Sequence, residues 1–265
     1  MTIIGELING TREAVREAIT RRDADAITQL AVRQAEAGAD YLDCNVGMIG
    51  AAEVELMAWL VETVSRVVDL PLCIDTASPD AMRAGLDACR DGSRPICNSV
   101  SLESARLESF LPIIAERQVR VIALLMTDAG VPKGVQERVD AATRLVPELE
   151  GAGVAREDTF IDAVVTPLSV DPEGPSVAME AMREIVAALP GAHTICGVSN
   201  VSYGLPRRAL LNRVFLSQAI AAGLDSAILD PCDGALMAAL HAAEALAGRD
   251  EWCGNYLQAY RRGVL

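Results

Sequence analysis

Residues 193–208 read HTICGVSNVSYGLPRR and show the unit from which the fold is built. The apolar run 193–198 is typical of a buried strand, and the polar loop after it, marked by Gly204 and Pro206, leads into an apolar helix pattern over 209–222. A parallel strand presents an active-site loop in this way. An ordinary connection that uses Ser and Asn as turn residues is the plainer alternative, and the neighbouring segments decide between the two.

The same strand, loop and helix unit repeats along the chain. The strand candidates cover residues 3–8, 41–46, 70–75, 94–99, 119–126, 159–164, 193–198 and 226–229. Eight repeats in about 250 residues predict an α/β fold, a single (β/α)8 TIM barrel that spans residues 1–265 as one domain. A doubly wound open sheet is the main competitor, but it usually has fewer strands and often a G-x-G-x-x-G motif, which this chain lacks.

Helical patterns fill the intervals between these strands. They cover residues 12–20, 26–37, 52–68, 79–90, 102–116, 135–151, 176–188, 206–222, 235–247 and 252–262. Asp23 or Asp25 is suited to cap the second of them, and Ser78 with Pro79 to open the fourth.

Charge and composition exclude several classes of protein. The 265 residues carry a net charge of −14, which argues against nucleic acid because binding to phosphates needs clustered Lys and Arg. No apolar run of about 18 residues predicts a transmembrane helix. The first residues, MTIIGE, have neither a basic region nor a cleavage pattern, so we expect a cytoplasmic protein.

Cysteine and histidine usage argues against a metal site. The seven cysteines form no C-x-x-C pair, and several lie in apolar runs, so we expect buried free thiols rather than disulfides or zinc ligands. The two histidines leave little material for a His-based metal site or a Ser-His-Asp triad.

Most strand candidates end in an acid or an amide. These polar residues are Glu6, Asn9, Asp43, Asn45, Asp75, Asn98, Asp162, Ser199, Asn200 and Asp230. In a barrel, all of these strand ends meet at one mouth. A ring of Asp and Asn without a Lys, His or Cys nucleophile suits a neutral heteroaromatic ligand that presents N–H donors and ring acceptors. A magnesium site formed by Asp43, Asp75 and Asp230 is the alternative.

Six segments resemble the ordered motifs of the pterin-binding barrel family: IGELIN (4–9), LDCNVG (42–47), IDT (74–76), CNS (97–99), ID (161–162) and GVSNVS (197–202). Within that family the chain is similar to the methyltetrahydrofolate:corrinoid methyltransferases, which include the folate domain of cobalamin-dependent methionine synthase. GVSNVS with LLNRVFL (210–216) is the most specific part. Dihydropteroate synthases resemble it less well there.

The resemblance implies a role for individual residues. It assigns pterin binding to Asp43, Asn45, Asp75, Asn98, Asp162, Gly197 and Ser199. Asn200 would donate to or accept from N5, the folate atom that carries or receives the methyl group. Arg207 and Arg208 would meet the glutamate tail of folate, or else are solvated charges at the start of a helix. Tyr203 departs from the polar side chains of some members.

The resemblance also implies the reaction and its partners. The substrate would be tetrahydrofolate or 5-methyltetrahydrofolate, and the methyl group would move to or from the cobalt of a corrinoid (cobalamin) held by a separate protein, in a direction that the sequence leaves open. That protein would contact the loops near Gly47, Thr127, Thr166 and Tyr203. A homodimer is implied as well.

Two further functions stay open at this point. One is a dihydropteroate synthase, although that chemistry generally relies on a Lys in the loop after the seventh strand, where this chain has none. The other is a folate-binding module without transfer activity, against which the complete set of Asp75, Asn98, Asp162 and Asn200 argues.

Overall fold

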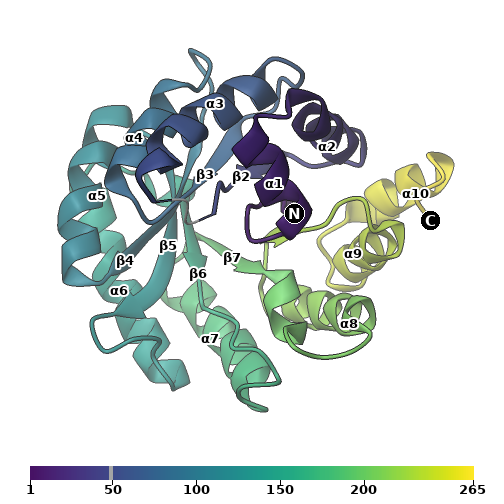
Figure 1. Cartoon of the computed structure of the whole chain (residues 1–265). Coiled ribbons are helices and arrows are strands. Elements are labelled where there is room, and N and C mark those ends of the chain that lie inside the picture. Colours follow the sequence, from purple (N-terminus) through teal and green to yellow (C-terminus); the bar gives the residue numbers. More distant parts are fainter. Residues whose placement is uncertain (48–49) are drawn as a thin grey trace.

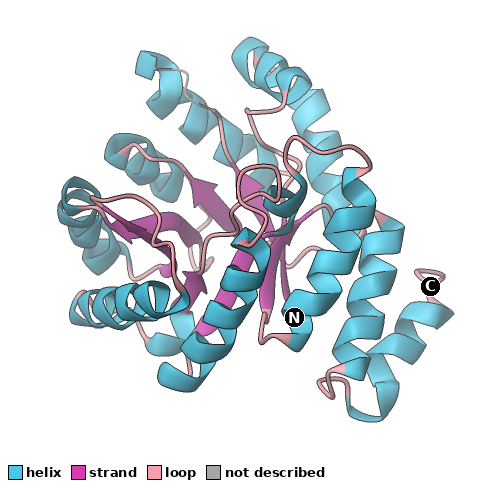
Figure 2. Cartoon of the chain, turned by 90° about the horizontal axis from the view of Figure 1, so that it is seen from below, coloured by secondary structure: helices cyan, strands magenta, loops and turns pink. Residues whose placement is uncertain are grey.

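The computed structural model describes residues 1–47 and 50–265. Within them, eight parallel strands pair in chain order, and β1 (Thr2–Gly5) pairs with β8 (Ser226–Leu229) to close a barrel. The helices form an outer layer around the strands (Figures 1 and 2). The predicted (β/α)8 TIM barrel is therefore confirmed.

The predicted elements have counterparts whose ends shift by a few residues. The other strands are β2 (Tyr41–Cys44), β3 (Leu72–Asp75), β4 (Ile96–Leu102), β5 (Arg120–Thr127), β6 (Thr159–Asp162) and β7 (His193–Gly197). The helices are α1 (Glu13–Arg21), α2 (Ala24–Glu36), α3 (Glu53–Ser65), α4 (Pro79–Asp87), α5 (Ser104–Arg117), α6 (Val135–Gly151), α7 (Gly174–Ala188), α8 (Arg208–Ala221), α9 (Gly234–Leu246) and α10 (Gly254–Arg261). The last of these, α10, packs outside the barrel against α9 (Figure 1).

The first strand is shorter than predicted because a side chain replaces its neighbour. Oε1 of the buried Gln34 accepts a hydrogen bond from the Leu7 N–H at 2.9 Å. A side chain at Gly5 would lie 2.5 Å from this oxygen, so glycine permits the close approach. The regular ladder with β2 is therefore interrupted after Gly5 and resumes at the parallel bridge between Asn9 and Asn45.

The fourth strand is longer than predicted and irregular. It continues past Ser99, and its register against β5 shifts between Asn98 and Val100 and again between Val100 and Leu102. Bulges of this kind bend a strand and redirect its side chains. This one lies where β4 reaches the mouth.

Local sequence explains where several helices begin. The Asp23 side chain accepts from the N–H of Ala26 at 3.1 Å and caps α2, and the Ser78 hydroxyl accepts from Ala81 at 3.2 Å ahead of Pro79. The predicted start of α8 at Pro206 is wrong by two residues. Arg207 has a left-handed φ of 52°, which no residue of a right-handed helix adopts, so α8 begins at Arg208.

One apolar layer fills the inside of the barrel, and every strand contributes a residue to it. In strand order the members are Ile4, Tyr41, Cys73, Ile96, Ile122, Phe160, Ile195 and Ile228. Burying a large apolar side chain stabilises a fold by about 1.5–3 kcal/mol, so this layer, hereafter the interior layer, contributes strongly to stability. A second, larger core lies between the strands and the helices.

Among the described helices, none combines the length and apolar character that a bilayer span requires. All seven cysteines are free, as predicted, and Cys44, Cys73, Cys97 and Cys196 are buried. Cys232 and Cys253 are exposed.

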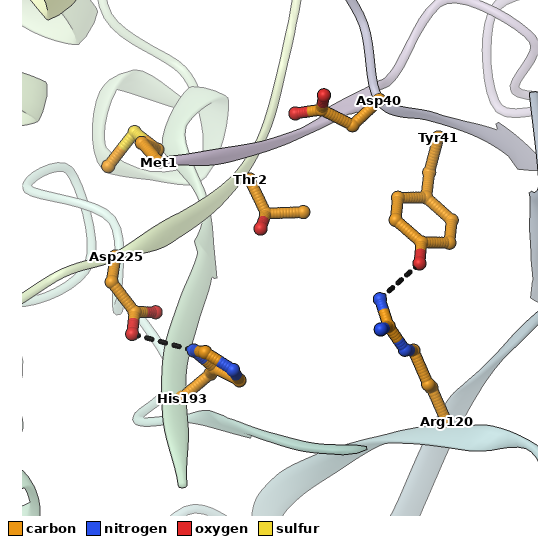
Figure 3. A pocket seen from close by; sticks show the side chains of 7 residues that line it. All are labelled: Met1, Thr2, Asp40, Tyr41, Arg120, His193 and Asp225. Carbon is orange, nitrogen blue, oxygen red and sulfur yellow. Dashed lines mark hydrogen bonds and ion pairs between the residues drawn. The ribbon is translucent and has the colours of Figure 1, made fainter. Parts of the chain in front are cut away.

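Below the interior layer, the amino-terminal ends of the strands line an open cavity of about 500 Å³ (Figure 3). Its lining residues are Met1, Thr2, Asp40, Tyr41, Arg120, His193 and Asp225. Nδ1 of His193 lies 2.8 Å from Oδ2 of Asp225, and the imidazole stacks on Phe160 at 5.1 Å between ring centroids. The hydrogen bond with Asp225 raises the pKa of His193, so this contact favours the protonated ring.

The His193–Asp225 contact makes barrel stability depend on pH. Because the folded pKa of His193 lies above its ordinary value of 6.5, its stabilisation is complete below pH 6.5 and is lost as the pH rises through the folded value. We expect His193→Phe, which keeps the stack on Phe160, to lower the free energy of unfolding by about 0.5–1 kcal/mol at pH 5.5 and by less at pH 8.5. Urea denaturation at the two pH values measures this difference.

His241→Phe is the matched control, because burial lowers the pKa of His241 and the sign of its pH dependence is therefore opposite. A cost for His193→Phe that stays equal or grows toward pH 8.5 would contradict the assignment.

Candidate functional site

The alternation of side chains along a strand places a polar ring directly above the interior layer. Two residues after each member of that layer, the strands present Glu6, Asp43, Asp75, Asn98, Leu124, Asp162, Gly197 and Asp230. Six of these eight are acids or amides. They share the inward face of their strands at the carboxyl-terminal end of the barrel, where barrel enzymes carry their chemistry.

Hydrogen bonds join four of the predicted site residues from three neighbouring strands. Nδ2 of Asn45 donates to Oδ2 of Asp75 at 2.7 Å, and Nδ2 of Asn98 donates to Oδ1 of Asp43 at 3.3 Å. Oδ1 of Asn45 accepts from the N–H of Gly47 at 2.6 Å, which fixes the orientation of its amide. The four side chains therefore form two hydrogen-bonded pairs, and the interaction between Asp43 and Asp75 brings the pairs together as one floor.

The two acids of this floor interact strongly. Burial and the neighbouring charge of Asp75 raise the pKa of Asp43 well above its usual range. Burial also raises the pKa of Asp75, but the hydrogen bond from Asn45 and the charge of Arg106 oppose the rise. Asp43 is thus the member of the pair that holds its proton longer. A protonated Asp43 can donate a hydrogen bond, whereas Asp75 accepts, so the floor offers both roles to a ligand.

Asp162 bonds to its own turn rather than to the floor. Its Oδ1 accepts from the N–H of Val164 at 2.8 Å, and no described residue donates to its Oδ2. Burial raises the pKa of Asp162 to about 6, although the Val164 hydrogen bond and the charge of Arg138 lower it. Above pH 6 this side chain is therefore an ionised acceptor with one oxygen free for a ligand.

Asn200 lies at the edge of the ring, on a turn that follows β7. This turn, η3 (Val198–Ser202), is a short 3-10 helix. The Asn200 side chain is exposed, and no described residue forms a hydrogen bond with its amide. A Cβ added at Gly197 would lie 3.0 Å from its Nδ2, so the absent side chain lets the amide pack against the strand end. Among the predicted residues, Asn200 is the one whose amide is fully available.

A polar network holds this turn in place. The Ser199 hydroxyl donates to Oε2 of Glu6 at 2.9 Å, and Oε1 of Glu6 accepts from Arg12 at 2.8 Å. Arg208 donates to the Ser199 carbonyl at 2.8 Å and to the Ser202 hydroxyl at 3.1 Å. The turn is therefore tied both to the end of β1 and to the start of α8.

The two arginines predicted for a ligand tail differ in their surroundings. The guanidinium of Arg208 donates hydrogen bonds to the Asn200 turn. In contrast, no described residue accepts a hydrogen bond from the side chain of Arg207, which is exposed. Tyr203 is 66% exposed beside the turn.

In the part of the chain that the structure describes, no group of three or more His, Cys, Asp or Glu side chains is arranged to hold a metal ion.

Three residues that support the site, one glutamate and two arginines, are missing from the site predicted from the sequence. Glu6 is noted there only as a polar strand end, yet it binds the Ser199 hydroxyl, and burial raises its pKa. Arg106 donates to the carbonyls of Ser99 and Thr76 at 2.8 and 3.3 Å, behind Asn98 and Asp75. Arg138 does the same behind Asp162.

The sequence does contain a pattern that indicates a buried role for Arg138. It lies on the buried stripe of α6 with Ala141, Ala142, Leu145 and Leu149, at helical spacing, and an arginine on an apolar stripe needs buried acceptors. Two of the three residues that accept from it, Ala163 and Val164, come from a loop distant in the chain, so the sequence alone does not name them.

Comparison with known proteins extends over the whole chain. A methylcorrinoid:tetrahydrofolate methyltransferase of Eubacterium limosum is 34% identical over 100% of this chain and 98% of that protein. The methionine synthases of Mycobacterium leprae and Mycobacterium tuberculosis are each 31% identical over 86% of this chain. The chain spans only 20% of the length of these two enzymes.

Solved structures share the architecture at lower identity. Dihydropteroate synthase from Xanthomonas albilineans in complex with 7,8-dihydropteroate has a TM-score of 0.71 and 20% identity, over 92% of this chain and 93% of that one. The same enzyme with 4-aminobenzoic acid also gives 0.71. At this identity the likeness supports the fold alone.

The sequence also matches a protein family over most of its length. The family described as "Pterin binding enzyme" matches residues 5–230, which include the polar ring and the Asn200 turn. The chain therefore belongs to the pterin-binding enzyme family.

Proposed function

We propose that the polar ring binds the pterin of a reduced folate and that the chain transfers a methyl group between N5 of tetrahydrofolate and the cobalt of a corrinoid protein. The observation that carries this proposal is the ring of acids and amides with the available amide of Asn200 at its edge. The relative from Eubacterium limosum, which matches from end to end and is named for this chemistry, supports it.

The ring offers acceptors and donors in the arrangement that a pterin needs. In this proposal Asp75, Asn98 and Asp162 bind the amino group and the ring nitrogens, because carboxylates accept from paired N–H groups and amides both donate and accept. Asp43 and Asn45 complete the floor, and Gly197 at the end of β7 and Ser199 in the turn form the wall. The interior layer closes the barrel beneath the ligand, so the pterin binds from the mouth.

Asn200 acts at the atom where the reaction occurs. A methylcorrinoid supplies the methyl group when its carrier protein docks at the mouth, and the cobalt keeps the electron pair of the broken bond. In this direction N5 attacks with its lone pair and gains positive charge, and its proton is then released. In reverse, N5 needs a proton or a strong hydrogen bond as the methyl group leaves. A positioned amide can serve both directions without titrating.

The direction that we favour runs from the methylcorrinoid to tetrahydrofolate. The Eubacterium limosum relative is named in this direction and matches over nearly its full length. The mycobacterial methionine synthases match through one segment of much longer enzymes.

Further features belong to the same proposal. The chain acts as one domain, 1–265, in the cytoplasm as a homodimer, and its free thiols suit a reducing compartment. In this proposal the corrinoid protein contacts the loops near Gly47, Thr127, Thr166 and Tyr203. The exposed Arg207 is the better candidate for the folate glutamate, since Arg208 is bound to the turn.

Replacing Asn200 tests the reaction step. We expect Asn200→Ala to lower the rate of methyl transfer about 100-fold while the Kd for tetrahydrofolate changes by less than about threefold, because its amide acts on charge that develops during the reaction. Single-turnover transfer from methylcobalamin and titration of folate binding measure the two quantities. Asn255→Ala, an exposed amide on α10, is the control. Equal losses of rate and binding would contradict the role.

The pH dependence of binding tests the role of Asp162. Since the pKa of Asp162 is raised to about 6, we expect the Kd for tetrahydrofolate to increase as the pH falls from 7 to 5, where the carboxyl becomes protonated. Asp162→Asn should weaken binding at pH 7 by about tenfold and flatten this dependence. Isothermal titration calorimetry measures both. An unchanged profile in Asp162→Asn would assign the titration to another acid.

A further inference from the structure

Arg138 is a buried cation with an unusual set of partners. Its side chain is 2% exposed, and none of the described carboxylates forms an ion pair with it. Instead, Nη1 donates to the carbonyls of Ala163 and Val164 at 2.6 and 2.7 Å, and Nε donates to the carbonyl of Pro132 at 3.0 Å. Burying a guanidinium is costly, and here all of its hydrogen bonds to described residues go to peptide oxygens, while Asp162 and Asp171 act on it through their charge alone.

The two inner acceptors belong to the turn that carries Asp162. Val164 has a φ of 60°, a left-handed conformation that is rare for a β-branched residue. From this conformation its N–H bonds to Oδ1 of Asp162, and its carbonyl and that of Ala163 point to one guanidinium nitrogen. A strained turn of this kind persists only where its surroundings hold it.

We propose that Arg138 is a positioning residue of the folate site, which holds the 162–164 turn so that Oδ1 of Asp162 is bound to Val164 while Oδ2 stays free for the pterin. The inference rests on the proposed function, because it concerns the residue that would hold the pterin. It adds to that function a contact from α6, outside the barrel mouth.

The charge of Arg138 acts in the same sense as its hydrogen bonds. The charged or titratable groups that act on Asp162 and its turn are Arg138 from α6, the buried Cys196 thiol from β7, and Asp171, whose charge acts on Arg138 from the loop after β6. Arg138 is the only cation in this described set, and its charge lowers the pKa of Asp162. Without it, less of the Asp162 side chain would be ionised near neutral pH.

The geometry of the acceptors explains why the residue is arginine. Three carbonyls on two different loops converge on Nε and Nη1, which the planar fork holds in a fixed relation. The single ammonium of a lysine carries the charge but cannot reproduce the fork. Arg138→Lys and Arg138→Met therefore separate the effect of charge from that of geometry.

The test measures tetrahydrofolate binding between pH 5 and 8.5 by calorimetry. We expect Arg138→Met to move the midpoint of the pH profile upward by about one unit and to raise the Kd at pH 7 by about tenfold or more. Arg138→Lys should raise the Kd at every pH with a smaller shift of the midpoint. Arg144→Met, an exposed arginine on the same helix, should match the wild type.

Val164→Gly provides a rescue experiment. Glycine adopts a φ of 60° without strain, so in the Arg138→Met background it should recover part of the lost affinity at pH 8.5, where Asp162 is ionised in every variant. The midpoint should stay shifted, because the charge is still missing. This double variant also keeps the test possible if Arg138→Met alone does not fold, as judged by circular dichroism.

Three outcomes are decisive. Folate binding by the wild type with an unchanged Kd and midpoint in Arg138→Met would overturn the inference and leave the proposed function intact. A uniform loss of affinity without a shift of the midpoint would assign Arg138 a merely structural role. Absence of folate binding by the wild type would instead overturn the proposed function.

Discussion

The interior layer of the barrel is the constraint on which the rest of the structure depends. Each strand contributes one apolar residue to it, from Ile4 on β1 to Ile228 on β8, and these residues seal the barrel between its two ends. Because side chains alternate along a strand, the residues two positions later share the same inward face. The layer therefore sets the height and orientation of the polar ring, and it separates this ring from the cavity around His193.

Much of the fold follows from the sequence because the repeating pattern of apolar runs and helices is local. Turns and contacts between distant residues are harder to predict. β1 ends early because Gln34 from α2 takes the place of a strand partner, and β4 continues because a bulge at Asn98 bends it. Arg207 delays α8 through a left-handed conformation that its residue type does not suggest. In each case a neighbour distant in sequence, or an unusual backbone angle, overrides the local pattern.

The candidate site shows the same division. Acids and amides at strand ends are visible in the sequence, and the structure joins Asp43, Asn45, Asp75 and Asn98 as one floor. The arginines behind them are harder to predict, because their acceptors are backbone carbonyls. Arg106 and Arg138 each hold the residues that follow a buried acid, so the helix layer stabilises the ring from outside the barrel.

The hydrogen bond between Ser199 and Glu6 crosses the seam where the chain closes on itself. β8 lies between β7, which the Asn200 turn follows, and β1, which Glu6 follows. This hydrogen bond therefore links the Asn200 turn to the first residues of the chain across the end of β8. A chain without its final strand would leave these two flanking strands unjoined, so the Asn200 turn would lose its contact with Glu6.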